Sequence, residues 1–150
     1  MYKIHKHSKA ITFHNNDTEY ELLDQTVLKK WLHQTAVECG FIISFLHYEF
    51  CSDEALLVIN QQYLQHDYYT DIITFNYNDN THVQGDIYIS IDRVKDNAKK
   101  YKTNRVDELH RVMVHGLLHL CGFDDKTPAH KKIMREREDQ ALCTLSDLIK

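Results

Sequence analysis

Apolar positions follow two periodicities along the first two thirds of the chain, one typical of strands and one typical of helices. Four segments rich in β-branched and aromatic residues are expected to be strands: residues 11–14, 41–50, 71–77 and 85–91. Helical spacing or a polar surface pattern predicts three helices between them: residues 24–39, 52–64 and 92–102. Asp24 and Ser52 are expected to cap the first two helices, and the polar run 78–81 to join two antiparallel strands.

The last third of the chain is expected to form two helices. The first begins at Thr103 or Asn104 and ends at Gly122. Its apolar face is formed by Val106, Leu109, Met113, Leu117 and Leu120. The second follows Thr127, an N-cap, with Pro128 in the first helical position, where its missing N–H costs nothing. Together the elements predict an α+β fold, in which a single mixed sheet of about four strands is covered by helices.

Length and charge limit the classes to which the chain can belong. A chain of 150 residues, 43% of them hydrophobic, suits one globular domain spanning residues 1–150. The net charge of −4 excludes a globally basic nucleic-acid binder but leaves room for a local basic patch. Residues 1–10 hold no apolar run of a signal peptide, and no apolar run in the chain is long enough to cross a membrane. We therefore expect a cytoplasmic protein with no membrane partner. Its four cysteines form no C-x-x-C pair and are expected to be reduced thiols.

Two histidines near the end of the first C-terminal helix suggest a metal site. His115 and His119 are four residues apart, so they stand on one side of a helix about one turn apart. Gly122 can reverse the chain just after them, because glycine adopts positive φ without penalty. Asp124 or Asp125 can then return to provide a third ligand. Three protein ligands with a fourth position open to water are the arrangement of a catalytic zinc.

The spacing is specific once its later members are included. A random chain with 11 histidines would contain roughly 0.8 His-x-x-x-His pairs, so the pair alone means little. Requiring glycine three residues later, and histidine or an acid six residues later, lowers the expectation to roughly 0.005. The ligand pattern is similar to that of the metzincin zinc proteases. In those proteases, however, the residue after the first histidine is a glutamate that acts as general base, whereas here it is Gly116.

The same stretch resembles a different family more closely. Eight residues match the signature H-G-x-L-H-L-x-G-(Y/F)-D-H of the YbeY proteins: His115, Gly116, Leu118, His119, Leu120, Gly122, Phe123 and Asp124. The segment from Asn60 to Phe75 resembles the family's L-N-x-x-Y-R-x-x-D-x-x-T-D-V-L-S-F, and residues 85–87 resemble the G-D-I that opens its next strand. The resemblance covers about residues 40 to 145.

This resemblance implies a function and a site. YbeY proteins are single-strand-specific endoribonucleases of rRNA maturation. It implies a zinc-dependent endoribonuclease, with one Zn²⁺ per chain, that processes the 3′ end of small-subunit rRNA and serves ribosome quality control. Its partners would be rRNA and the small ribosomal subunit. The metal ligands would be His115, His119 and Asp125, while the residue that moves the proton is not indicated.

Two departures from the family pattern affect the site. The third family ligand is a histidine, and Asp125 stands there; carboxylate oxygen is also an acceptable zinc ligand. The spacing from Gly122 favours Asp125 over Asp124. The family arginine after the tyrosine at position 63 is replaced by Leu64, which cannot bind phosphate. Lys126 or Arg111 are the candidates to replace that cation.

Other features leave alternatives open. Two basic runs could guide a phosphate backbone or be solvated surface: Lys95, Lys99, Lys100, Lys102 and Arg105, and Lys126, Lys131, Lys132, Arg135 and Arg137. Tyr68 and Tyr69 could stack on bases. Glu108, seven residues before His115, is a candidate to orient an imidazole or a solvated helix residue. The alternative functions are a zinc metalloprotease-like hydrolase and a non-catalytic ribosome-assembly factor with a structural metal.

Overall fold

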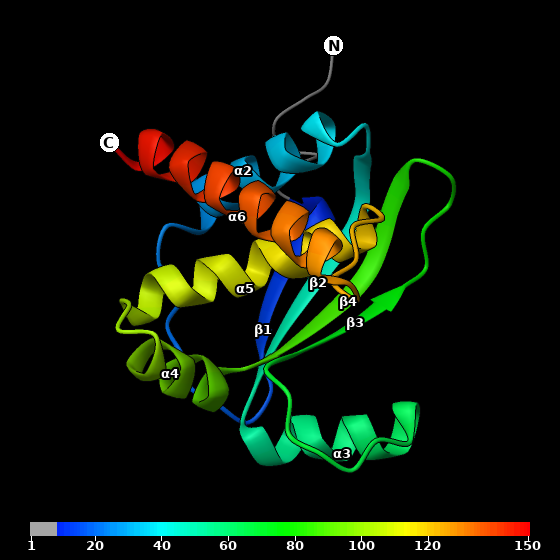
Figure 1. Ribbon diagram of the computed structural model, residues 1–150, viewed down its shortest axis with the longest axis vertical. Helices are drawn as coiled ribbons and strands as arrows, with labels where there is room; N and C mark the ends of the chain where they lie inside the picture. Colours follow the sequence, from blue (N-terminus) through cyan, green and yellow to red (C-terminus); the bar gives the residue numbers. More distant parts are fainter. Residues whose placement is uncertain (1–8) are drawn as a thin grey trace.

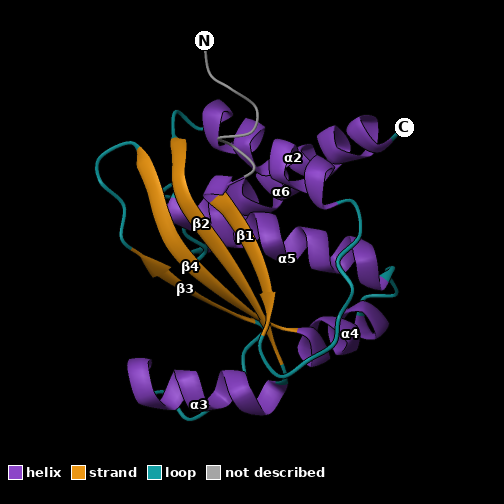
Figure 2. Cartoon of the chain, turned by 180° about the vertical axis from the view of Figure 1, so that it is seen from behind, coloured by secondary structure: helices purple, strands orange, loops and turns teal. Residues whose placement is uncertain are grey.

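A four-stranded sheet forms the centre of the molecule, and helices cover both of its faces (Figures 1 and 2). The computed structural model describes residues 9–150. The elements are β1 (Ile11–Asn15), α2 (Gln25–Glu38), β2 (Ile42–Cys51), α3 (Asp53–Leu64), β3 (Ile72–Asn76), β4 (His82–Ser90), α4 (Ile91–Lys100), α5 (Arg105–Leu120) and α6 (Pro128–Ile149). The predicted α+β fold with a mixed sheet of four strands is confirmed. The segment 1–8, where a signal peptide was not expected, lies outside the described residues.

The strand order is β1-β2-β4-β3, so β3 lies at one edge of the sheet. The pairs β1–β2 and β2–β4 are parallel, and β3–β4 is antiparallel, as expected from the polar turn between these last two strands. β4 begins at His82, three residues before the predicted start at Gly85. Its first residues pair with Ile42 and Ile43 of β2, and this long-range pairing extends the strand beyond its apolar segment.

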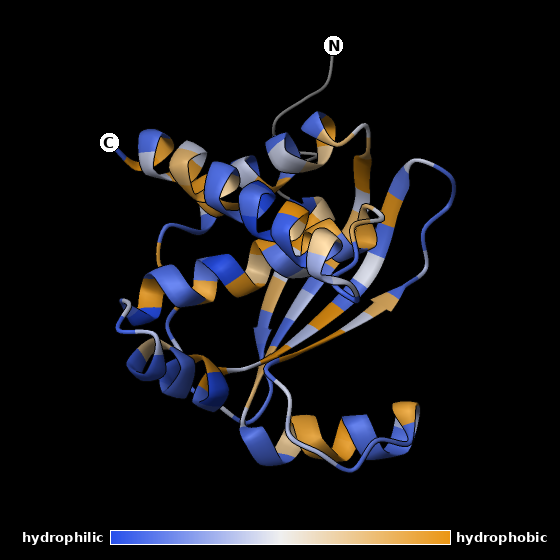
Figure 3. Ribbon diagram, viewed as in Figure 1, coloured by the Kyte–Doolittle hydropathy of each residue, from blue (hydrophilic) through white to orange (hydrophobic). Residues whose placement is uncertain are grey.

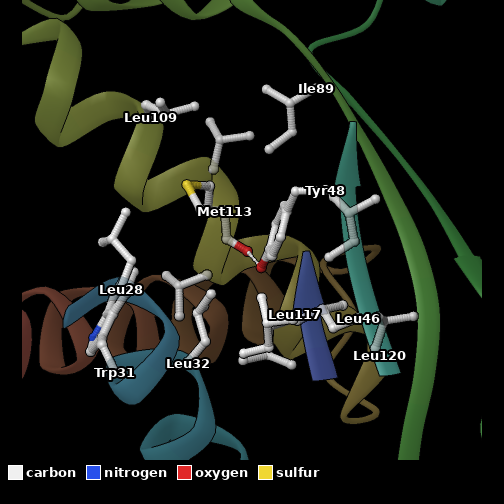
Figure 4. Packing of buried hydrophobic residues seen from close by; sticks show 14 of the residues in the cluster. Leu28, Trp31, Leu32, Leu46, Tyr48, Ile89, Leu109, Met113, Leu117 and Leu120 are labelled. Atoms are coloured by element: carbon white, nitrogen blue, oxygen red, sulfur yellow. Dashed lines mark hydrogen bonds between the residues drawn. The ribbon is translucent and has the colours of Figure 1, made fainter. Parts of the chain in front are cut away.

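The main core lies between the sheet and the helices α2, α5 and α6 (Figure 4). Two buried polar groups are satisfied within it: the Tyr48 hydroxyl donates to the Met113 carbonyl at 2.8 Å, and Trp31 Nε1 donates to the Ala141 carbonyl at 2.7 Å. A second, smaller cluster places α3 on the opposite face, over Cys51 and Ile73. In Figure 3, α4 is hydrophilic over most of its length, as predicted for a surface helix.

Local capping signals explain where most helices begin. The Ser52 hydroxyl accepts from the backbone N–H of Ala55, and Thr127 caps α6 in the same way, with Pro128 as its first residue. Asn104, not Thr103, caps α5. Asp24 occupies the N-cap position of α2, as predicted, but it has a left-handed backbone, with φ 57°, and its side chain makes no capping hydrogen bond.

Two glycines allow α5 to approach the edge of the sheet. A Cβ at Gly116 would lie 2.8 Å from the Ile72 side chain, and a Cβ at Gly85 would lie 2.7 Å from the Leu120 side chain. The backbones of α5, β3 and β4 can therefore pack more closely than side chains would allow. This contact fixes the end of α5, which carries both histidines, beside β3.

No helix in the described part of the chain combines the length and apolarity needed to cross a bilayer. All four cysteines are free thiols, in agreement with the expectation that they form no disulfide frame.

Candidate metal centre

The two histidines and Asp125 meet at the end of α5. His115 Nε2 lies 3.5 Å from Asp125 Oδ2, and His119 Nε2 lies 3.7 Å from the same oxygen. The two imidazole rings are nearly perpendicular, with centroids 4.5 Å apart. The predicted ligands His115, His119 and Asp125 are thus brought together, with one potential ligand atom from each lying within 4.8 Å of the other two.

A tight helix end brings Asp125 to the histidines. Gly122 has φ 96°, and its N–H donates to the His119 carbonyl while the Phe123 N–H donates to the Leu118 carbonyl. This pair of bonds is the Schellman motif, which ends a helix with a left-handed residue. The chain therefore turns back immediately after α5, as the position of Gly122 predicted.

The separations fit a tetrahedral ion. Zinc bound at about 2.0–2.1 Å to nitrogen and oxygen places neighbouring ligand atoms about 3.3 Å apart. The observed distances of 3.5 and 3.7 Å exceed this by only a few tenths of an ångström. Two imidazoles and one carboxylate are also a ligand set that zinc accepts. Each histidine therefore lies close to the distance from Asp125 that a shared ion would require.

Asp124 has a different place. Its Oδ1 lies 2.8 Å from His130 Nδ1 and accepts a hydrogen bond from the Lys126 backbone N–H at 3.2 Å. It therefore connects the loop to the start of α6 and has the structural role of a turn residue. The geometry favours Asp125 as the third ligand, in line with the spacing argument.

A buried carboxylate on α6 holds the first histidine in position. Glu138, only 5% exposed, accepts a hydrogen bond from His115 Nδ1 at 2.6 Å and another from Arg111 Nη1 at 2.8 Å. This bond leaves Nε2 of His115 directed at Asp125. Sequence reasoning missed Glu138 and considered Glu108 instead. Glu108 is buried and not solvated, but the residue that bonds His115 is Glu138.

The electrostatics of the two histidines differ. Burial acts to lower the pKa of His115, but the hydrogen bond and charge of Glu138 outweigh it and raise the pKa. Burial and the neighbouring charge of His115 lower the pKa of His119. For Glu138, burial acts to raise the pKa, and the bonds from His115 and Arg111 reverse this and lower it. Glu138 is therefore a carboxylate held by hydrogen bonds to both His115 and the Arg111 guanidinium.

A cavity of about 210 Å³ borders His115 between α4, α5, α6 and the residue that precedes β3. It is lined by Asp71, Asn97, Tyr101, Glu108, Arg111, Val112, His115, Arg135 and Glu138. Burial raises the pKa of Asp71, although the charge of His115 opposes the shift. Burial also raises the pKa of Glu108, against the charge of Arg111. His115, one of the three candidate ligands, therefore borders a groove lined by charged groups.

Comparison with known proteins agrees with this geometry. Residues 3–146 match a family model described as endoribonuclease YbeY. The chain belongs to the YbeY endoribonuclease family. The resemblance inferred from the histidine motif is thereby confirmed, and the family is one of metal-dependent endoribonucleases.

Individual relatives support the assignment over nearly the whole chain. An endoribonuclease YbeY of Cytophaga hutchinsonii is 50% identical over 138 residues, covering 89% of this chain and 94% of the relative. One of Parabacteroides distasonis is 43% identical, covering 92% and 97%. The solution structure of a Thermotoga maritima protein matches with a TM-score of 0.64 at 24% identity, over 90% of this chain and 88% of that one. This last likeness supports the fold alone.

No cation stands at the position of the YbeY arginine, because that position is occupied by Leu64. Leu64 is the last residue of α3, which packs on the face of the sheet opposite α5. Arg111, one candidate replacement, is already bonded to Glu138 and to Asp139, at 2.8 and 2.7 Å. It is therefore a structural cation that supports the site. Lys126 follows Asp125 directly and is exposed.

Proposed function

We propose that this protein is a zinc-dependent endoribonuclease that cleaves single-stranded regions of ribosomal RNA. The proposed substrate is the 3′ end of small-subunit rRNA, and the proposed setting is ribosome maturation and quality control in the cytoplasm. Residues 1–150 would form a single YbeY domain. The observation that carries the proposal is the convergence of His115, His119 and Asp125 in a member of this family.

His115, His119 and Asp125 would hold one Zn²⁺ per chain. The bound ion would lower the pKa of a coordinated water toward ~7 and polarise a phosphodiester oxygen. Asp125 contributes a negative charge where the family has a neutral imidazole, and this charge offsets part of the charge of the ion. Glu138 keeps the His115 ring in the orientation that directs Nε2 at Asp125, where the ion would be held, because carboxylate partners fix both tautomer and ring orientation.

Metal content and RNA cleavage test this proposal together. Zinc per chain is measured in the wild type, Asp125→Ala, Asp124→Ala and His119→Ala. We expect about one ion in the wild type and in Asp124→Ala, and loss of zinc in the other two variants. The same proteins are assayed with a single-stranded RNA, with and without a chelator, and with casein to detect protease activity. Cleavage of RNA should follow zinc content, and casein should remain intact.

Different failures point to different conclusions. RNA cleavage that persists after chelation and in His119→Ala would overturn the metal-nuclease mechanism. Zinc-loaded protein that folds normally but leaves RNA intact would favour a structural metal, especially if the chain unfolds when the metal is removed. Equal zinc loss in Asp124→Ala and Asp125→Ala would remove the assignment of the third ligand.

A further inference from the structure

The groove beside His115 contains one arginine that no carboxylate holds closely. Arg135 of α6 lines the cavity together with His115, and 64% of its side chain is exposed. Its nearest acidic atoms are Glu138 Oε1 at 3.9 Å and Asp139 Oδ1 at 4.0 Å. Both distances exceed those of a hydrogen bond, so the donors of the guanidinium remain available to a ligand.

Arg111, the other arginine of the cavity, has the opposite character. It makes short hydrogen bonds to both Glu138 and Asp139, and only 20% of its side chain is exposed. A phosphate could bind Arg111 only by displacing one of these carboxylates. Because those same carboxylates are satisfied by Arg111, they bind Arg135 only weakly. The two arginines therefore have different roles. Arg111 pairs with Glu138 and Asp139, and Arg135 lines the open groove.

The acids of the cavity do not prevent an anion from reaching Arg135. Glu138 is paired with both His115 and Arg111. Glu108 is buried in the wall, and Asp71 is partly buried and bonded weakly to Asn97 at 3.4 Å. The guanidinium, in contrast, lies at the solvent side. The exposed guanidinium is more accessible to a ligand from solvent than the buried carboxylates of Glu138 and Glu108.

The size of the cavity limits what it can hold. Its volume of about 210 Å³ is smaller than the roughly 300–1,000 Å³ of pockets that enclose a whole small molecule. It suits one portion of a longer ligand, such as a phosphate and its sugar. Arginine binds phosphate in a bidentate manner, which positions a nucleic-acid backbone without reading its sequence.

We propose that Arg135 binds a backbone phosphate of single-stranded RNA in this cavity, next to the candidate metal ligand His115. Arg135 thereby supplies a cation from α6, an element different from α3, where Leu64 lies. This inference rests on the proposed ribonuclease function and adds to it a substrate-binding residue. It also assigns a specific role to one residue of the second basic run. Of the basic residues of that run, all of which the structure describes, Arg135 alone lines the cavity.

The alternative is that Arg135 only stabilises α6. Its partners Glu138 and Asp139 lie three and four residues later, the spacing of ordinary helix surface ion pairs. In that case the substitution would alter helix stability slightly and would leave RNA binding unchanged. Phosphate binding and helix stabilisation by Arg135 therefore predict different salt dependences of RNA affinity, because helix stability does not affect that dependence.

The test compares Arg135→Gln with Arg135→Lys and with a control, Lys30→Gln. Lys30 is exposed on α2, and its substitution removes one positive charge outside the cavity. The affinity of each full-length protein for a fluorescent single-stranded RNA is measured by anisotropy in the presence of a chelator, over a series of salt concentrations. KM and kcat are then measured with the zinc-loaded proteins, and zinc content is determined for each.

We expect Arg135→Gln to raise Kd and KM roughly five- to tenfold at low salt, which is the effect of losing one charge-assisted contact. The slope of log K against log salt should fall by about 0.7, the value for one phosphate contact on a single strand. Arg135→Lys should keep the wild-type slope, because it keeps the charge. Zinc content should be unchanged in all variants, and Lys30→Gln should bind RNA like the wild type.

An Arg135→Gln protein that binds and cleaves RNA with wild-type KM and salt slope would overturn this inference and leave the ribonuclease proposal intact. An equal change in Lys30→Gln would also overturn it, because it would show a general charge effect. If the zinc-loaded wild type neither binds nor cleaves single-stranded RNA, both proposals fall together.

Discussion

Glu138 provides a direct way to test whether the second layer of the site sets its metal affinity. The carboxylate lies 2.6 Å from His115 Nδ1 and is 5% exposed, so the bond is shielded from solvent. In Glu138→Gln the side chain keeps its shape and can still accept from Nδ1, but the negative charge disappears. The imidazole then becomes a weaker ligand, and Arg111 loses one of its two charged partners.

The expected magnitude follows from the character of this bond. Substitution of such carboxylate partners of metal-bound histidines lowers metal affinity about 10- to 100-fold, which corresponds to about 1.4–2.8 kcal/mol. Because Glu138→Gln preserves a neutral hydrogen bond, we expect the lower part of that range. Glu138→Ala, which removes the acceptor as well, should reach the upper part. The fold should survive in Glu138→Gln, since the amide fills nearly the same volume.

Competition with a chromogenic zinc chelator measures the affinity, and Asp139→Asn is the matched control. Asp139 is the other partner of Arg111, at 2.7 Å, but it is 57% exposed and belongs to no bond with His115. We expect wild-type zinc affinity in Asp139→Asn. Wild-type affinity in Glu138→Gln, or an equal loss in Asp139→Asn, would refute the argument that the His115 bond tunes the metal.

Three further predictions concern the fold. Burial acts to raise the pKa of Glu49, but hydrogen bonds from His47 and other neighbours outweigh it and lower the pKa. The wild type should therefore be more stable than Glu49→Gln above the unfolded pKa of Glu49, about 4.5, and should lose this advantage as the pH falls through the lower pKa of the folded state. A difference in urea unfolding that does not change with pH would contradict this prediction. Gly116→Ala should lower the unfolding free energy by up to about 2 kcal/mol, because overpacking against the sheet costs about 1–3 kcal/mol and the gain in helix propensity is about 1 kcal/mol. A more stable variant in urea unfolding would show that the sheet accommodates the methyl group. Tyr48→Phe should cost about 1 kcal/mol in the same measurement, because the buried hydrogen bond to Met113 is lost, and an unchanged midpoint would count against that bond.

Features encoded by neighbouring residues could be predicted from the sequence. The caps at Ser52 and Thr127 and the chain reversal at Gly122 each depend on residues within one helical turn. Asp24 shows the limit of this reasoning. It has the right residue type before a helix, but its backbone is left-handed and its side chain does not cap. Residue type gives the opportunity for a cap, and the path of the incoming chain decides whether it forms.

The candidate site also contains residues that could be predicted from the local sequence and residues that could not. His115, His119 and Asp125 lie within eleven consecutive residues, so helix geometry and one glycine turn were enough to bring them together. Glu138 is 23 residues beyond His115, on another helix, and no periodicity links the two. Its role depends on how α6 crosses α5, which is a property of packing. The loosely held state of Arg135 likewise depends on Arg111 occupying the shared acids, a contact that only the folded chain defines.

Gly116 shows how packing restricts the chemistry that a two-histidine helix can support. A metzincin would have its glutamate base at this position. Here a Cβ would lie 2.8 Å from Ile72 Cδ1 and 3.0 Å from Ile87 Cδ1, so two isoleucines already fill the space that such a side chain would need. The helix is held against the sheet because residue 116 has no side chain, and the same absence removes the protease base. The metzincins and this family therefore share a ligand pattern but not the group that acts as the protease base. The groove beside His115 instead presents an exposed cation, Arg135.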